Sequence, residues 1–136
     1  MTKKITVLIF IALMLTQLNC APRGFSKQIE NIIEEQKLSS SELKELIDKK
    51  DKGFVLIDVR SESEYNSGYI PTAINIPYTT IQERSEEIPK DKLVIVYCKV
   101  GGRAETARKK LIELGYENVI NFGGTNSWEY ELEKRN

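Results

Sequence analysis

Two uninterrupted runs of apolar residues, at positions 54–57 and 93–97, are the strongest pattern along the chain. Polar or turn-forming residues bound each run, and Cys98 directly follows the second. Continuous apolar runs of this length are typical of strands that a parallel sheet buries on both faces. We expect two shorter strands as well, at residues 73–76 and 118–121.

Between these runs, hydrophobic residues recur three or four positions apart, which is the spacing of a helix with one buried face. The pattern extends over residues 28–36 and 103–114. Ser39 and Glu42 have the spacing of a capping box, so another helix is expected to begin there. Further helices are expected at residues 61–66, 80–87 and 126–134.

Strands that alternate with helices indicate an α/β fold, in which helices flank a central parallel sheet on both faces. The 136 residues leave room for one domain. We expect this domain to span residues 37–136, and residues 20–36 to form a tether and an N-terminal helix ahead of it.

The first residues have the pattern of a targeting segment. Lys3 and Lys4 precede an apolar stretch at residues 5–15 that is too short to cross a bilayer comfortably. Cys20 follows this stretch, in a position that resembles the cleavage site of bacterial lipoproteins. We therefore expect residues 1–19 to be a signal peptide that is cleaved before Cys20.

The lipoprotein resemblance also implies where the protein is found. In that class of proteins the new N-terminal cysteine carries a lipid, which here would be attached to Cys20. The protein is then exported and anchored to a bacterial membrane, where it faces the periplasm or the outside. The alternatives are an ordinary signal peptide and an uncleaved N-terminal anchor.

Composition excludes several classes of function. The 20 basic and 20 acidic residues cancel, and nothing in their distribution indicates a surface for nucleic acid. The absence of histidine excludes triads that use a histidine base and removes the commonest metal ligand. Cys20 and Cys98, the two cysteines, cannot form a zinc site without other ligands. We therefore expect neither a metal nor a cofactor.

The candidate chemistry lies in the turn that follows the second apolar run and begins at Cys98. Ligands of open α/β sheets bind at the carboxyl ends of strands, and this turn connects such an end to a helix. Gly101 and Gly102 let backbone N–H groups turn toward one point, and the helix N-terminus adds partial positive charge. Lys99 and Arg103 add full charges. Together these features favour a thiolate and predict that Cys98 is a nucleophile; the alternative is a buried structural cysteine.

Several motifs, in order, resemble those of the rhodanese-like or sulfurtransferase family. Residues 58–60, at a strand end, are similar to the family's Asp-Val-Arg motif, and residues 68–77 are similar to its Gly-His-Ile-Pro-Gly-Ala-Ile-Asn-Ile-Pro stretch. The turn at Cys98 resembles its Cys-x-x-Gly-x-Arg loop. The chain departs from the family at Tyr69, where His is usual, and at Thr72, where Gly is usual. The likeness extends from about Ser39 to Trp128.

The resemblance implies a thiosulfate sulfurtransferase. A small donor such as thiosulfate or a persulfide would give its outer sulfur to Cys98, and a thiol or cyanide would then remove it. Asp58 and Arg60 would support the site, either directly or as a strand-end ion pair, and Trp128 would belong to the core. The loop that would hold the sulfur consists of Lys99, Val100, Gly101, Gly102 and Arg103.

Three other functions remain open at this point. Cysteine-dependent phosphatases of the same fold have a similar loop, but with one more residue between the cysteine and the arginine than residues 99–102 provide. Some rhodanese-like domains are non-catalytic binding or sensing modules, although these usually lack the cysteine. A redox protein would need a disulfide between Cys98 and an unmodified Cys20.

Overall fold

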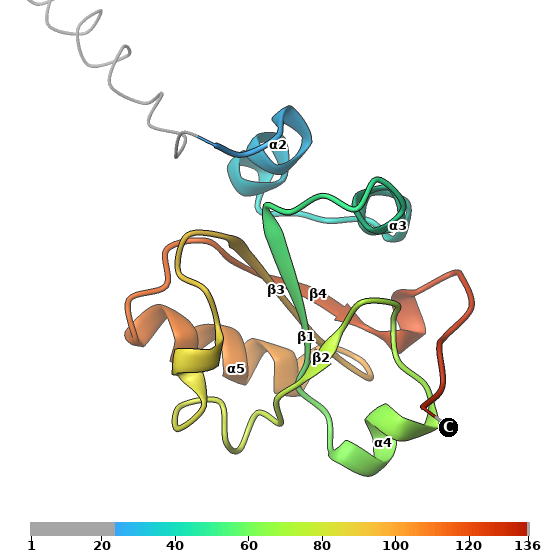
Figure 1. The fold of residues 1–136 in the computed structure, drawn as a ribbon. Coiled ribbons are helices and arrows are strands. Elements are labelled where there is room, and N and C mark those ends of the chain that lie inside the picture. The colour runs from blue at the N-terminus through green and yellow to red at the C-terminus, as the bar shows by residue number, and fades with distance from the viewer. Residues whose placement is uncertain (1–23, 136) are drawn as a thin grey trace, which may run out of the picture.

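A computed structural model describes residues 24–135 of the chain, so the expected signal peptide and Cys20 lie outside the described residues. Within this range, four parallel strands form one sheet in the order β2-β1-β3-β4. Helices cover both faces of the sheet, and the α/β fold expected from the sequence is confirmed (Figure 1). The strands are β1 (Phe54–Asp58), β2 (Ile74–Asn75), β3 (Leu93–Cys98) and β4 (Val119–Gly124).

The α-helices begin close to where the sequence pattern places them. Ser39 and Ser61 each accept a hydrogen bond from the backbone three residues on, and each forms a capping box with the glutamate at that position. No helix in residues 24–135 is long and apolar enough to span a membrane. The helices are α2 (Lys27–Glu35), α3 (Ser40–Asp48), α4 (Glu62–Ser67) and α5 (Gly102–Glu113).

Strand β3 separates two layers of the core. Ile95 and Tyr97 pack with α2, α3 and α4 on one face, whereas Val96 and Cys98 pack with α5 on the other. All residues of β3 are buried, which explains why the sequence shows an uninterrupted apolar run instead of an alternating one. The alternation places the side chain of Cys98 on the α5 side of the sheet.

The prediction of a helix at residues 80–87 is wrong. The chain there forms turns, followed by the short 3-10 helix Ser85–Glu87. Ile81 is the one apolar residue of this segment, so a helix there would have no apolar stripe to bury. The buried side chains of Ile81 and Ile88 instead hold the turns against the α5 layer.

The prediction of a helix at residues 126–134 is also wrong. Every second residue from Trp128 to Leu132 is apolar and the residues between are glutamates, which is the period of an extended chain. After the short 3-10 helix η2 (Thr125–Ser127), the chain is extended, and Tyr69 and Glu133 exchange two backbone hydrogen bonds of 2.9 Å in an antiparallel bridge. Trp128 is buried in the core, as expected.

The end of β4 packs against the loop that follows β3. A Cβ atom built on Gly124 would lie 2.3 Å from the carbonyl carbon and oxygen of Lys99 and 2.6 Å from the carbonyl oxygen of Cys98. These neighbours are backbone atoms, which cannot move aside without moving the loop. Gly124 is therefore required by close backbone approach, and β4 determines where the Cys98 loop can lie.

Gly124→Ala is expected to lower the free energy of unfolding by about 1–3 kcal/mol, because the added methyl group overpacks the contact between β4 and the loop. Urea unfolding followed by circular dichroism measures the effect. Gly102→Ala is the matched control, because a Cβ atom at Gly102 meets nothing within 4 Å. Equal unfolding midpoints for the two variants would contradict the proposed backbone contact.

Candidate active site

Cys98 is the last residue of β3, and only 1% of its surface is exposed. The loop that follows it turns directly into α5, whose first residue is Gly102. The N–H group of Gly101 donates a hydrogen bond to the Cys98 Sγ atom, with an N···S distance of 3.0 Å. The sulfur therefore lies in the turn between strand and helix, where the sequence predicted a candidate nucleophile.

Two opposing effects set the pKa of Cys98. Burial raises the pKa of the thiol, whereas hydrogen bonds from the N–H groups of Ala104, Gly101, Val100 and Arg103 lower it. The hydrogen bonds prevail, so the pKa of Cys98 lies below its usual range. Backbone dipoles stabilise the thiolate here, and this activation requires no general base.

The loop is held in shape from the side of β4. The side-chain amide of Asn121 donates to the carbonyl oxygen of Gly101 at 3.1 Å, and the N–H of Asn126 donates to the carbonyl oxygen of Lys99 at 3.2 Å. Gly101 has a φ of 114°, which favours glycine. Asn121 acts through its side chain and Asn126 through its backbone, and neither contact belongs to a sequence motif that would have indicated it.

The side chains of the loop do not all point at the sulfur. Lys99 is exposed, and Val100 is 71% exposed, so both contribute their backbone rather than their side chains to the turn. Arg103 is the exception. Its pKa is raised mainly by its hydrogen bonds with Glu64, and the Cys98 sulfur raises it further.

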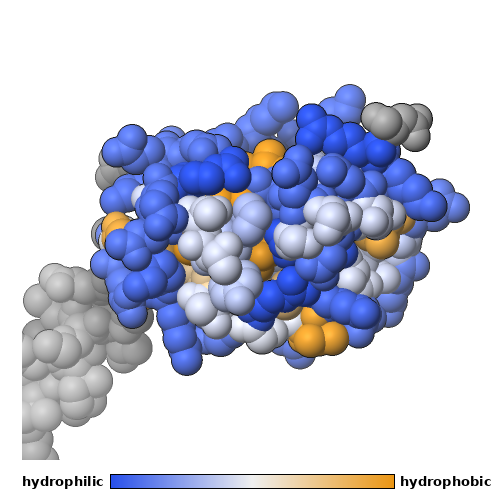
Figure 2. Space-filling model, turned by 90° about the horizontal axis from the view of Figure 1, so that it is seen from below, coloured by the Kyte–Doolittle hydropathy of each residue, from blue (hydrophilic) through white to orange (hydrophobic). Residues whose placement is uncertain are grey.

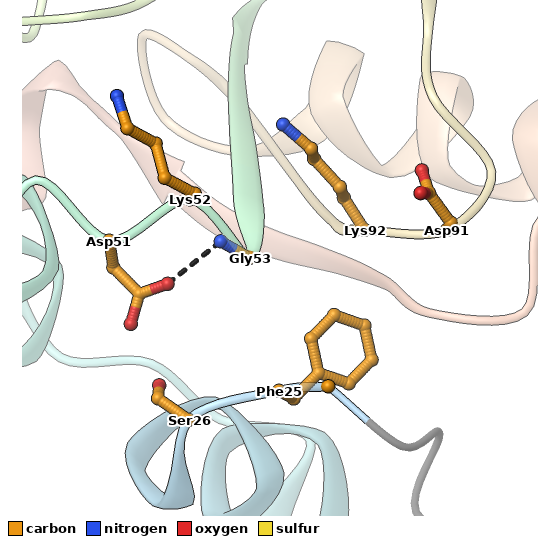
Figure 3. A pocket seen from close by; sticks show the side chains of 8 residues that line it. Phe25, Ser26, Asp51, Lys52, Gly53, Asp91 and Lys92 are labelled. Atoms are coloured by element: carbon orange, nitrogen blue, oxygen red, sulfur yellow. Dashed lines mark hydrogen bonds between the residues drawn. The ribbon is translucent and has the colours of Figure 1, made fainter.

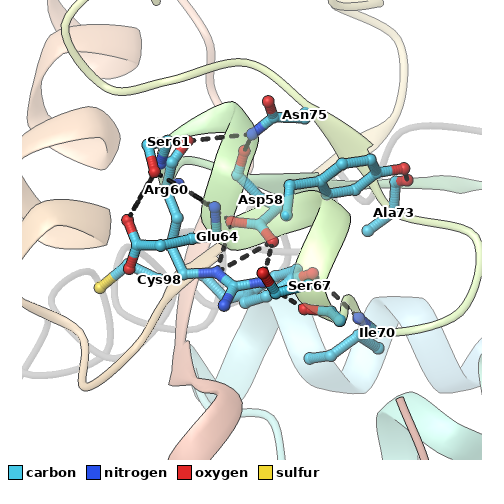
Figure 4. Close-up of polar contacts among 12 residues, drawn as sticks. Asp58, Arg60, Ser61, Glu64, Ser67, Ile70, Ala73, Asn75 and Cys98 are labelled. Atoms are coloured by element: carbon cyan, nitrogen blue, oxygen red, sulfur yellow. Dashed lines mark hydrogen bonds and ion pairs between the residues drawn. The ribbon is translucent and has the colours of Figure 1, made fainter. Parts of the chain in front are cut away.

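Glu64 of α4 forms a two-pronged ion pair with Arg103 of α5. The distances are 2.7 Å from Nη1 to Oε2 and 2.9 Å from Nη2 to Oε1. The hydrogen bonds from Arg103 lower the pKa of Glu64 to about 2, against the effect of burial. The same carboxylate accepts hydrogen bonds from Ser61 at the start of α4 (Figure 4). Glu64 also forms the capping box of α4 with Ser61, and no local sequence pattern indicates its contact with the loop.

Asp58 and Arg60 form a buried ion pair behind the site. Arg60 Nε lies 3.0 Å from both carboxylate oxygens of Asp58, and Nη2 lies 2.6 Å from Oδ2 (Figure 4). Arg60 Nη2 also donates to the carbonyl oxygen of Gly68 at 2.6 Å. Within the described residues, no hydrogen bond joins either side chain to Cys98. The pair therefore connects the end of β1 to the end of α4, which agrees with a supporting role.

Tyr97 connects the same region to β3. Its hydroxyl accepts a hydrogen bond from the N–H of Ile70 at 3.0 Å, and burial together with the charge of Asp58 raises its pKa. The side-chain amide of Asn75 donates to the carbonyl oxygens of Asp58 and Arg60, both at 3.0 Å. The carboxyl ends of three strands are thus joined by buried polar contacts beside the Cys98 loop.

The two departures from the family pattern lie next to this region. Tyr69 stacks on Tyr65, with ring centroids 4.3 Å apart and an interplanar angle of 19°. Thr72 has a φ of 72°, a conformation that glycine adopts easily and that is strained for a β-branched residue. Thr72 therefore stands in a backbone conformation that would suit a glycine, and Tyr69, where histidine is usual, forms an aromatic pair with Tyr65.

One pocket lies away from the sulfur, at the opposite end of the sheet. This pocket of about 660 Å³ lies where β1 and β3 begin, between Phe25 and Ser26 on one side and Lys52 and Lys92 on the other (Figure 3).

The face at the carboxyl ends of the strands is mostly hydrophilic, with residues of intermediate hydropathy near its centre (Figure 2). No group of three or more acidic or cysteine side chains in residues 24–135 is arranged to hold a metal ion.

Comparisons with known proteins show which family this chain is similar to. The family model described as "Rhodanese-like domain" matches residues 39–131. A putative sulfurtransferase from Bacillus subtilis, YtwF, is 36% identical over 104 residues, which cover 76% of this chain and all of the relative. The thiosulfate:glutathione sulfurtransferase of Saccharomyces cerevisiae is 34% identical over 119 residues, which cover 77% of this chain and 86% of the relative.

A solved structure leads to the same family. A rhodanese from E. coli, determined with anions, superimposes with a TM-score of 0.56 at 33% sequence identity. The match covers 60% of this chain and 99% of the rhodanese. The resemblance noted in the sequence motifs therefore extends to the overall fold.

Asp58→Ala is expected to lower the free energy of unfolding by about 3–5 kcal/mol, because it leaves the Arg60 guanidinium buried without its partner. Asp48→Ala serves as the matched control. Asp48 pairs with Lys44 on the surface and its side chain is 58% exposed, so its loss is expected to cost about 0–1 kcal/mol. Thermal and urea unfolding of both variants measure the difference. A loss at Asp58 no greater than that at Asp48 would exclude a bracing role for the buried pair.

Proposed function

The chain belongs to the rhodanese-like domain family, and on that basis we propose that it is a sulfurtransferase that works through a persulfide on Cys98. The donor is a small molecule that carries a sulfane sulfur, such as thiosulfate, and the acceptor is thiophilic. The observation that carries the proposal is the set of N–H groups, including that of Gly101, that surrounds the Cys98 sulfur and lowers its pKa.

The proposed reaction has two displacements. The Cys98 thiolate attacks the outer sulfur of thiosulfate, the bond between the two donor sulfurs breaks, and sulfite leaves with the bonding electron pair. The persulfide that forms carries its negative charge on the outer sulfur, where the loop N–H groups can stabilise it. Cyanide or a thiolate then attacks that sulfur and regenerates the Cys98 thiolate.

The chemistry fits a chain without histidine. No proton has to be removed once the thiolate exists, so neither displacement requires a general base. The N–H groups that lower the pKa of Cys98 are backbone groups, and they stay in place regardless of pH. The short loop of residues 99–102 and the pairing of Arg103 with Glu64 favour a single sulfur atom over a phosphate group.

We further propose that the protein is exported and held to a bacterial membrane by a lipid on Cys20. The described residues support this anchor through the position at which the tether joins the domain. Gly24 and Phe25 line the pocket at the beginning of β1 and β3, at the end of the sheet opposite Cys98 (Figure 1). An anchor attached there would leave the Cys98 loop facing away from the membrane and open to soluble donors and acceptors.

Thiosulfate treatment is expected to add the mass of one sulfur atom to the intact protein, and cyanide is expected to remove it with release of thiocyanate. Intact-protein mass spectrometry measures both steps. Cys98→Ser is expected to gain no sulfur. No adduct with thiosulfate or any persulfide donor would exclude the proposed mechanism. A Cys98→Ser protein that keeps its cellular role would indicate a binding or sensing module instead.

The anchor is tested in a bacterial host that makes lipoproteins. Mass spectrometry of the N-terminal peptide is expected to show acyl chains on a chain that begins at Cys20, and Cys20→Ser is expected to release the protein from the membrane fraction. A native protein that still begins at Met1, or that lacks acyl chains at Cys20, would contradict the anchor without affecting the sulfur chemistry.

A further inference from the structure

The loop that holds Cys98 contains an arginine, Arg103, that is suited to bind an oxyanion and is already engaged with another residue. The guanidinium of Arg103 directs both terminal nitrogens at the carboxylate of Glu64, at 2.7 and 2.9 Å. This two-pronged geometry is the one an arginine uses to bind sulfate, phosphate or the sulfonate head of thiosulfate. Glu64 therefore occupies the positions on Arg103 that an anionic ligand would take.

We propose that Glu64 is a specificity-determining residue, which weakens the binding of tetrahedral oxyanions at the Cys98 loop by competing for Arg103. A sulfur donor is then recognised mainly by its outer sulfur and by the loop N–H groups, and little by an oxyanion head. The site is expected to favour persulfides over thiosulfate and other tetrahedral dianions. This choice of donor rests on the proposed sulfurtransferase function, whereas the competition for Arg103 does not.

The exposure of the ion pair makes this competition possible. The side chains of Arg103 and Glu64 are 33% and 35% exposed, so an anion from solvent can approach the guanidinium. The carboxylate is fixed in place because Ser61 donates to it from both its N–H, at 3.2 Å, and its hydroxyl, at 3.0 Å. A competing anion therefore has to displace Arg103 from a carboxylate that Ser61 holds in place.

The charges around the sulfur come from three elements. Arg103 belongs to α5 and Glu64 to α4, the side chain of Lys99 in the loop is exposed to solvent, and β4 contributes backbone at Gly123. Loss of the Glu64 charge leaves the positive charge of Arg103 without its partner, close to the sulfur. A nearby positive charge stabilises a thiolate, so the pKa of Cys98 is expected to fall when Glu64 is neutralised. Loosening of the loop would have the opposite effect, because lost N–H contacts raise that pKa.

Glu64→Gln is the variant that separates these effects. Glutamine has the same shape and can form the same capping box with Ser61, so α4 is expected to remain folded. Glu62→Gln is the matched control, because it removes the same charge from the same helix at an exposed position. The probe is alkylation of Cys98 by iodoacetamide in the full-length protein, measured with increasing sulfate and across a pH range.

In Glu64→Gln, sulfate is expected to protect Cys98 from alkylation about tenfold more effectively than in the native protein. The reason is that sulfate can then form about one additional charge-assisted, two-pronged contact with Arg103. The alkylation profile is expected to shift to lower pH. If sulfate protection in Glu64→Gln equals that in the native protein and in Glu62→Gln, or if the profile shifts to higher pH, Glu64 is a structural brace and the proposal is wrong.

Donor kinetics tests the second part of the proposal. The KM for thiosulfate is expected to fall in Glu64→Gln, while the KM for an uncharged persulfide donor stays within about twofold of the native value. Equal changes for both donors would overturn the assignment of donor preference. If neither donor forms a persulfide on Cys98, the proposed function fails, and the sulfate experiment still decides the role of Glu64.

Discussion

The backbone of β4 packs directly against the backbone of the loop that carries Cys98, and this contact determines the geometry of the site. Gly124 approaches the carbonyl group of Lys99 so closely that a single added carbon would lie 2.3 Å from it. The approach also lets the N–H of Asn126 reach the carbonyl oxygen of Lys99. With its carbonyl groups held on the β4 side, the loop can direct its N–H groups toward the sulfur. The absence of a side chain at Gly124 thus allows the loop geometry that lowers the pKa of Cys98.

A second set of contacts holds the loop from the side of α4. Glu64 pairs with Arg103 at the start of α5, and the buried pair of Asp58 and Arg60 connects the end of β1 to the carbonyl group of Gly68. The first pair is partly exposed to solvent, whereas the second is buried. The site therefore combines a buried ion pair that joins β1 to α4 with a partly exposed ion pair at the Cys98 loop.

Two positions show how the family turn tolerates change. Thr72 keeps the positive φ of a glycine although it is β-branched, because the surrounding turn, between α4 and β2, is held by the hydrogen bond from the Tyr65 hydroxyl to Ala73 at 2.7 Å. Tyr69 stacks on the same Tyr65 ring and also pairs through its backbone with Glu133. The C-terminal tail thus pairs with the turn at Tyr69.

The sequence alone determined the strands, the fold class and the place of Cys98, because local periodicity reveals a buried strand and Cys98 stands where such a strand ends. It did not determine the pairing of Glu64 with Arg103, since these residues are far apart in the chain and each has a sufficient local explanation, as a helix cap and as a loop charge. The expected helix at residues 126–134 is wrong: the alternation from Trp128 to Leu132 is a local sign of an extended chain, whereas the pairing of this segment with Tyr69 joins residues far apart in sequence. Only the tertiary structure brought β4 and α4 to the two sides of the loop, and long-range packing of this kind leaves no local pattern to read.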